Sequence, residues 1–149
     1  MKVQTREFGE IEIPEENIIL FNEGIPGFEE EKSFAILLNE DKDNPFHWLQ
    51  SLDTPDLAFI ITDPFKIYED YGVVLPQGAI EKLKIKSEED VIIYTIVVVP
   101  DEIEKMTTNL LGPVVINVKE KLGKQVILES SDYTTKHYVF KQDSPGEVK

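Results

Sequence analysis

The stretch VIIYTIVVV, residues 91–99, decides the fold of this chain. It is apolar at every position except Tyr94 and Thr95, and it is far too short to cross a membrane. An apolar run of this length is typical of a central strand that is covered on both faces. We therefore expect residues 91–99 in the middle of a sheet, with another element packed on the outer face.

Residues 77–84 are the best candidate for that covering element. Ile80 and Ala79 lie three and four positions before Leu83, the spacing that brings side chains together on one helix face. Pro76 favours a helix start at the next residue. The sequence therefore predicts a short helix at 77–84, and residues 101–105 can add one further helical turn.

Short β-like runs separated by turn residues fill most of the remaining sequence. This pattern favours an antiparallel barrel or sandwich over alternating β and α units. We predict a mainly β, small antiparallel β-barrel-like single domain over residues 1–142, with one or two short helices and a flexible tail at 143–149. A hairpin is expected at 121–124, turning around Gly123. The predicted strands are 3–7, 10–13, 18–21, 34–38, 48–52, 57–62, 72–75, 91–99, 114–118, 125–128 and 136–140.

The chain is strongly acidic, and the acidity is uneven. The 15 basic and 29 acidic residues give a net charge of -14, and residues 1–75 hold 5 of the basic and 17 of the acidic ones. Binding to nucleic-acid phosphates requires clustered Lys and Arg, so direct nucleic-acid binding is disfavoured. The negative charge favours a basic protein partner. The simpler interpretation is that the acidic surface only keeps the protein in solution.

No cysteine occurs in the sequence, which excludes disulfides, thiolate nucleophiles and thiolate metal ligands. The N-terminal residues are charged throughout and lack the apolar core of a signal peptide. We therefore expect a cytoplasmic protein that does not bind membranes.

The sequence offers no convincing catalytic, cofactor or metal site. His47, Ser51 and Asp53 are the types found in hydrolase triads, but residues four apart on one strand stand about 13 Å apart. His137 has no second histidine at metal-ligand spacing, and residues 40–45, EDKDNP, resemble a solvated turn rather than a calcium loop. We predict no catalytic residues, metal or cofactor, while a small-molecule-binding barrel or an unrecognised hydrolase stays open as the alternative.

The loop NEGIPGFEE, residues 22–30, is the clearest candidate contact surface. Pro26 between Gly24 and Gly27 predicts a rigid, pre-shaped turn. Such a turn would present Ile25 and Phe28 beside acidic residues with little loss of entropy on binding. The simpler interpretation is an ordinary turn with Phe28 buried in the core.

Two further segments have simple structural interpretations. In NLLGPVVIN, residues 109–117, Gly112 and Pro113 indicate a bulge or a strand start. In FHWLQSL, residues 46–52, Trp48 is expected in the core or, alternatively, facing a partner.

Five segments occur together, in order, over nearly the whole chain: GIPGF (24–28), FHWLQS (46–51), LAFIITDP (57–64), TTNLLGPVVIN (107–117) and QVILESSDYTTKH (125–137). Through them the chain resembles the FliW family of bacterial flagellar assembly factors. The resemblance implies a cytoplasmic β-barrel-like protein with two partners, flagellin and the RNA-binding translational repressor CsrA, between which it switches. An acidic antagonist suits a repressor that binds RNA through positive charge.

We predict the protein-binding residues from the rigid loop and from acidic positions that follow it. A third interpretation of the function is that the acidic chain mimics a nucleic acid and occupies the RNA groove of the repressor directly. The predicted contact residues are Ile25, Pro26, Gly27, Phe28, Glu29, Glu30, Glu31, Asp63, Glu69 and Asp70.

Overall fold

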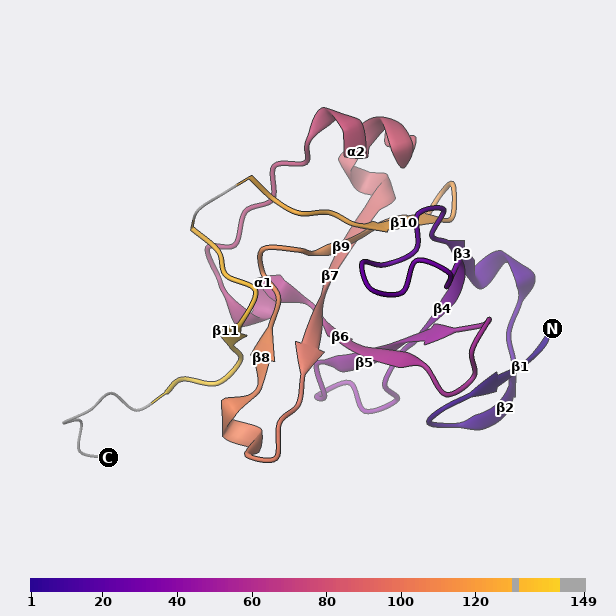
Figure 1. Ribbon diagram of the computed structural model, residues 1–149, viewed down its shortest axis with the longest axis horizontal. Helices are drawn as coiled ribbons and strands as arrows, with labels where there is room; N and C mark the ends of the chain where they lie inside the picture. The colour runs from indigo at the N-terminus through magenta and orange to yellow at the C-terminus, as the bar shows by residue number, and fades with distance from the viewer. Residues whose placement is uncertain (130–131, 143–149) are drawn as a thin grey trace.

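A ring of seven strands forms the body of the molecule (Figure 1). The computed structural model describes residues 1–129 and 132–142; the predicted tail at 143–149 lies outside the described residues. Each strand of the ring pairs with the next, and β9 pairs with the first half of β7. The strands, in ring order, are β3 (Ile18–Leu20), β4 (Ser33–Leu37), β5 (Phe46–Ser51), β6 (Ala58–Thr62), β7 (Val91–Val98), β9 (Val114–Asn117) and β10 (Leu122–Gln125).

The barrel closes through one short parallel seam. All other strand pairs are antiparallel, as predicted, but β3 and β10 run in the same direction with Leu20 opposite Leu122. Leu20 N donates to Lys121 O at 2.9 Å across this seam. The prediction of an antiparallel barrel is therefore correct except at its closure, because β3 and β10 are joined through the whole barrel rather than by a hairpin.

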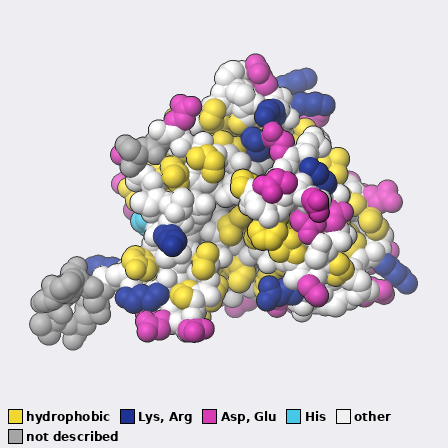
Figure 2. Space-filling view, viewed as in Figure 1, with side chains coloured by type: hydrophobic (Ala, Val, Ile, Leu, Met, Phe, Trp, Pro, Cys, Tyr) yellow, Lys and Arg dark blue, Asp and Glu magenta, His cyan; other side chains and the backbone are white. Residues whose placement is uncertain are grey.

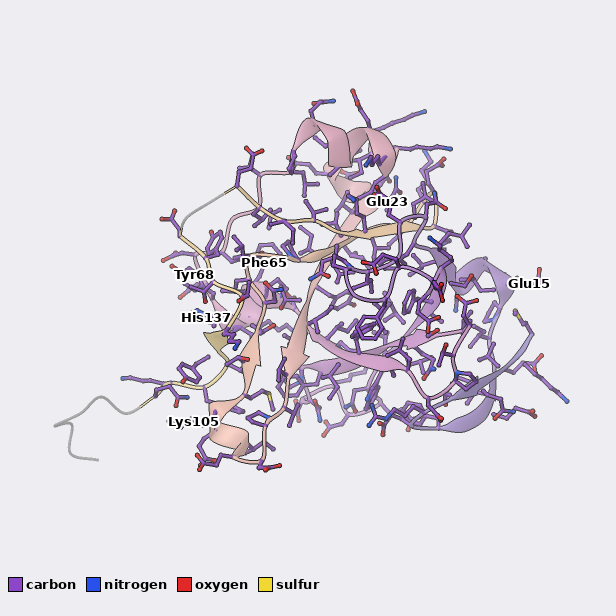
Figure 3. All side chains as sticks on the ribbon, in the orientation of Figure 1. Glu15, Glu23, Phe65, Tyr68, Lys105 and His137 are labelled. Carbon is purple, nitrogen blue, oxygen red and sulfur yellow. The ribbon has the colours of Figure 1, made fainter. Side chains whose placement is uncertain are left out.

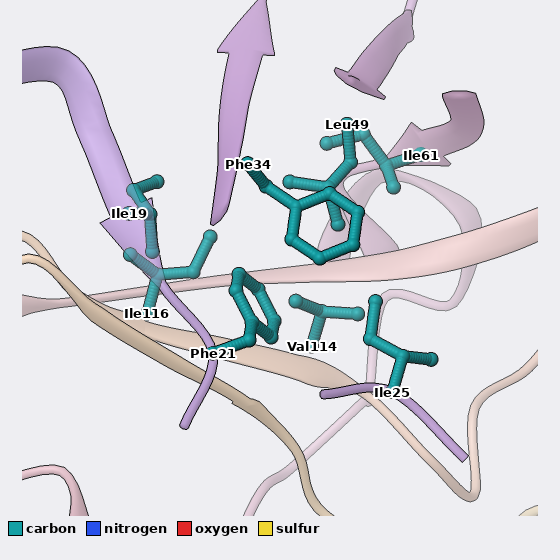
Figure 4. Packing of buried hydrophobic residues seen from close by; sticks show 8 residues of the cluster. All are labelled: Ile19, Phe21, Ile25, Phe34, Leu49, Ile61, Val114 and Ile116. Carbon is teal, nitrogen blue, oxygen red and sulfur yellow. The ribbon is translucent and has the colours of Figure 1, made fainter. Parts of the chain in front are cut away.

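The interior of the barrel is filled with apolar side chains (Figure 4). Phe21 and Phe34 are fully buried with their ring centroids 4.9 Å apart. Close packing of this kind leaves little room for a ligand. The buried cluster comprises Ile19, Phe21, Ile25, Phe34, Leu49, Ile61, Val114 and Ile116.

Strand β7 has apolar neighbours on both sides, which confirms the central role predicted for it. Ile92, Tyr94 and Ile96 pack on the interior cluster, whereas Val91 and Ile93 pack on a second cluster outside the barrel. Beyond that point the strand differs from the prediction, because Val98 is 62% exposed. There β7 leaves the ring and pairs with β8 (Thr107–Thr108), and β8 pairs in turn with β11 (His137–Tyr138). The sequence did not predict β8.

The outer cluster lies beneath the predicted helix. Helix α2 (Gln77–Lys82) follows Pro76 and directs Ala79 and Leu83 onto the outer faces of β7 and β9. A second helix, α1 (Pro64–Ile67), begins after Asp63, whose side chain accepts a hydrogen bond from Phe65 N. Three 3₁₀ turns, η1 (Glu15–Asn17), η2 (Glu88–Asp90) and η3 (Ile103–Lys105), complete the helical structure of the described residues, and η3 confirms the turn expected at 101–105.

A separate hairpin covers another part of the barrel exterior. Strands β1 (Lys2–Thr5) and β2 (Gly9–Glu12) pair only with each other, and Val3 and Ile13 pack on Ala35 of β4. At the tip, Phe8 contacts Trp48 edge to face at 5.1 Å. Trp48 is therefore half-buried under the hairpin and not part of the barrel core.

Two predictions for the second half are wrong: the strand at 72–75 and the hairpin turn around Gly123. Residues 72–75 form neither strand nor helix, and the hairpin turn lies before Gly123, with Lys121 at a φ of 58°. Gly123 lies inside β10, where a Cβ would stand 2.5 Å from the Phe21 ring. Of the strand predicted at 125–128, Gln125 ends β10 and residues 126–128 continue it as paired backbone, because Val126 N and Leu128 N donate to Pro113 O and Leu111 O. Strand β9 begins directly after Pro113, as predicted.

The exposed carboxylate of Glu23, labelled in Figure 3, connects the loop after β3 with α2 and β10. Glu23 accepts a hydrogen bond from Lys82 Nζ of α2 at 2.9 Å and another from Lys124 Nζ of β10. Lys124 and then Lys82 lower the pKa of Glu23 to about 2. The cluster ties α2 and β10 to the loop after β3.

Glu23→Gln is expected to remove stability that depends on pH. Since the folded pKa lies below the unfolded value, the ionised pair stabilises the fold above about pH 4.5 and loses its effect as pH falls toward 2. Solvent screening limits the loss at pH 7 to less than about 1 kcal/mol. Urea unfolding at pH 7 and pH 3 measures it. Glu15→Gln is the control, and an equal effect of both variants at both pH values would contradict the prediction.

No helix in residues 1–129 and 132–142 is long and apolar enough to cross a membrane.

Candidate functional site

The loop after β3 forms the tight turn that its sequence predicts, and hydrogen bonds within the loop hold it. Gly24 and Gly27 have φ values of 66° and 88°, which L side chains rarely adopt. Phe28 N donates to Ile25 O, and Gly27 N donates to the Glu29 carboxylate at 2.8 Å. Glu29 therefore helps to fix the turn that presents it.

The two apolar residues of the loop have different roles. Ile25 is 2% exposed and belongs to the barrel core, so it does not form the surface contact predicted for it. Phe28 is 41% exposed. Its ring packs edge to face with the ring of Phe59, and the two ring centroids are 5.1 Å apart. Neither sequence interpretation was complete, because the turn sends one apolar side chain inward and leaves the other at the surface.

Phe28 stands at the border of an open hollow with a volume of about 660 Å³, which we call the acidic recess. No lysine or arginine is among the residues that line it. On this face of the molecule, acidic side chains gather beside hydrophobic ones (Figure 2). The acidic recess is lined by Gly27, Phe28, Glu29, Glu30, Glu31, Asp53 and Thr54.

Asp53 and Thr54 are site residues that sequence reasoning did not select. Asp53 accepts backbone hydrogen bonds from Lys32 N and Ser33 N at 2.8 and 3.1 Å, which joins the β5–β6 turn to the start of β4. The pairing of Phe34 with Ser51 sets this neighbourhood. Only the register between β4 and β5 places Asp53 beside the loop after β3, and the sequence does not specify that register.

The other predicted acids lie elsewhere. Asp63 caps α1, and Glu69 and Asp70 are exposed in the turn that follows this helix. Asp53 precedes β6 and Asp63 follows it, so the acidic recess and the α1 acids stand at opposite ends of a strand about 17 Å long. The predicted residues therefore form two separate acidic groups.

The recess has the chemistry of a site for cationic side chains. Exposed carboxylates accept charge-assisted hydrogen bonds from Arg or Lys, and an exposed aromatic face attracts the same cations. The Nζ of the neighbouring Lys32 donates to Asn22 O at 3.0 Å, and among the described residues no ion pair joins Lys32 to an acid of the recess. The recess can thus receive a basic protein surface without losing an internal ion pair.

The two histidines have different neighbours, Tyr94 for His47 and Tyr68 for His137. His47 Nδ1 accepts a hydrogen bond from Asn39 N, and burial, followed by Lys66, lowers the His47 pKa. Ser51 Oγ accepts from Asp53 N and Thr54 N, and the Asp53 carboxylate accepts from Lys32 N and Ser33 N. Among the described residues, no hydrogen bond joins Ser51 or Asp53 to His47. His137 lies in a different place, beside Tyr68 at 5.3 Å (Figure 3).

In residues 1–129 and 132–142, no three His, Asp or Glu side chains are grouped so that they could hold a metal ion. Residues 40–45 form the turn between β4 and β5, and Asn39, Asp41 and Asn44 use their side chains to accept backbone N–H groups within it. This confirms the interpretation of EDKDNP as a solvated turn.

Comparison with known proteins places the chain in one family. The family model for FliW protein matches residues 2–139. The flagellar assembly factor FliW of Alkaliphilus metalliredigens is 48% identical over 142 residues, which cover 95% of this chain and 88% of that protein. The corresponding protein of Caldicellulosiruptor saccharolyticus is 46% identical over 138 residues, covering 93% and 90%.

A solved structure agrees with these sequence matches. The crystal structure of a flagellar assembly factor FliW superposes with a TM-score of 0.88 at 45% sequence identity, covering 95% of this chain and 98% of that one. With the sequence and the barrel both in agreement, the chain belongs to the FliW family of flagellar assembly factors.

Proposed function

We propose that this chain is a non-enzymatic, cytoplasmic regulator that binds flagellin and the translational repressor CsrA in alternation. While unexported flagellin occupies the chain, CsrA is free to repress flagellin translation. After export of flagellin, the released chain binds CsrA and displaces it from RNA. Such a switch requires that the two partners bind exclusively or with negative coupling.

The acidic recess carries this proposal. An RNA-binding repressor must present positive charge, and Glu30, Glu31 and Asp53 beside the exposed Phe28 form a complementary surface. Because the loop is held by internal hydrogen bonds, little entropy is lost when a partner docks on it.

The barrel interior counts against the alternative of a small-molecule-binding protein or hydrolase. Eight buried apolar residues fill the ring, including Phe21, Phe34 and Leu49. Five hollows on the described part of the chain have neither His47 nor His137 in their walls. A ligand site would need a convergent set of polar groups in such a cavity.

Size-exclusion chromatography and biosensor binding with the CsrA and flagellin of the same genome test the proposal. We expect a complex with each partner at micromolar concentration or tighter, and loss of one complex when the other partner is added. Binding of CsrA should weaken as salt rises, since exposed charges are screened. A ternary complex in which neither partner weakens the binding of the other would overturn the switch, and absence of both complexes would overturn the function.

Reversing the charge of the recess is expected to slow association with CsrA. In Glu30→Lys/Glu31→Lys, the on-rate at low salt should fall roughly tenfold, because the field that steers a basic partner is inverted there. Glu29 is left in place because its carboxylate holds Gly27 N.

The matched control is Glu15→Lys/Glu16→Lys, the same change of net charge at η1 on another part of the surface (Figure 3). Biosensor kinetics compare both variants with the parent chain. An equal decrease in both would show that net charge, and not the recess, controls association.

A further inference from the structure

Residues 72–75, GVVL, form no strand and pair with none in the part of the chain that the structure describes. This segment connects α1 to α2 (Figure 1). Gly72 N donates to the Tyr133 hydroxyl at 2.8 Å. The backbone groups of Val73, Val74 and Leu75 form no hydrogen bond with any residue that the structure describes. The sequence nevertheless favours a strand, since Val73 and Val74 are β-branched and Leu75 precedes a proline, which disfavours helical backbone there.

The side chains of this segment follow the alternation of a half-buried strand. Val73 and Leu75 pack on the outer apolar cluster that includes Tyr71 and Leu83. Val74, between them, is 87% exposed. An exposed β-branched residue in a stretch with unpaired backbone is the feature by which sheet edges recruit another strand.

Two hollows flank the segment, and both include Val73, Val74 and Leu75 in their walls. One has a volume of about 550 Å³ and is bounded by Leu128, Glu129, Asp132 and Tyr133. The other, about 650 Å³, is bounded by Phe65, Ile80, Ile85, Glu88, Val91 and Ile93. Hydrophobic side chains are visible on this part of the surface, below α2 (Figure 2).

The charges around the two hollows have one sign. Glu88 stands at one and Glu129 at the other, and no lysine or arginine lines either hollow. A second copy of this chain would bring the same carboxylates together, which disfavours self-pairing. A segment with basic residues between apolar ones would complement both the walls and the charges.

We propose that residues 72–75 accept an extended, positively charged segment of another protein, which adds to this edge as a β-strand. The partner backbone would pair with the unbonded groups of Val73 and Leu75, and its alternate apolar side chains would enter the flanking hollows. This surface is separate from the acidic recess, and the inference does not depend on the partners proposed above.

A pool of capped nine-residue peptides provides the probe. The peptides carry Val, Ile, Leu or Phe at alternate positions and Lys or Arg between them; a matched pool carries Glu in place of the basic residues. With the full chain and saturating basic pool, NMR should show amide exchange at Val73 and Leu75 slowed by at least about tenfold. The acidic pool, and a basic pool with N-methylated alternate amides, should give no protection.

Val74→Lys tests the same edge from the protein side. The substitution adds a like charge where the basic peptides would lie, and it should abolish the protection without unfolding the chain, because Val74 is exposed. Leu38→Lys, at another exposed position, should leave the protection unchanged. Three results would overturn the inference: no protection by the basic pool, equal binding of the N-methylated pool, or protection that arises from dimerisation of the chain without peptide.

Discussion

Gly123→Ala is expected to lower the free energy of unfolding by about 3 kcal/mol. A Cβ at this position would stand 2.5 Å from two atoms of the Phe21 ring, which is closer than any real contact. Phe21 cannot retreat, because it is fully buried and packs against Phe34. An overfilled core must then shift backbone or force side chains out of their rotamers. Urea denaturation followed by far-UV circular dichroism measures the change.

A second substitution separates this clash from a general effect of alanine. Phe21→Leu shortens the ring side chain, so the double variant Gly123→Ala/Phe21→Leu should lose less stability than the two single losses added together. Gly78→Ala in α2 is the control, because a Cβ there meets nothing within 4 Å and should stabilise the helix by about 0.5–1 kcal/mol. Strict additivity in the double variant would contradict the assigned contact.

Gly24→Ala is expected to destabilise the fold by about 2–4 kcal/mol and to disrupt the acidic recess. The residue has a φ of 66°, and its Cβ would stand 2.6 Å from the Glu29 Cα. The backbone strain and the clash act together, and the clash is with main-chain atoms that cannot rotate away. Since Glu29 belongs to the recess, binding of CsrA should weaken as well. Denaturation and biosensor binding measure the two effects.

Gly27→Ala isolates the strain from the clash. Gly27 also has a positive φ, 88°, but a Cβ there meets no atom within 4 Å. Only the strain applies, so the loss should be about 1–2 kcal/mol and the recess should keep its shape. Equal losses in the two variants would show that the approach of Gly24 to Glu29 is not what shapes the loop.

Local pattern was enough to predict the elements with strong periodicity. The run at 91–99 and the spacing of Ala79, Ile80 and Leu83 correctly predicted a central strand and the helix over it. The Gly/Pro pattern around Pro26 correctly predicted a constrained turn. In these segments, the residues that determine the structure are close together in the sequence.

Features that depend on distant contacts could not be predicted in this way. Gly123 resembles a turn glycine, yet it lies in a strand because the Phe21 ring occupies the space beside it. The β-like residues at 72–75 do not form a strand, because no described strand pairs with them. Asp53 lies in the acidic recess because of the strand register, which the sequence does not reveal. Ile25 is buried instead of lying at the surface because the direction of the turn sends its side chain inward.

The parallel seam also has a consequence for the order of folding. Leu20 and Leu122, which face each other across it, are about a hundred residues apart in the chain. The antiparallel pairs β4–β5 and β5–β6 join near neighbours and carry a small loop-closure entropy. The seam cannot form until nearly the whole chain has been synthesised, and contacts of such large sequence separation slow folding. The antiparallel strands β3 to β6 therefore stay without their last neighbour, and Phe21 stays uncovered on that side, until β10 has been synthesised.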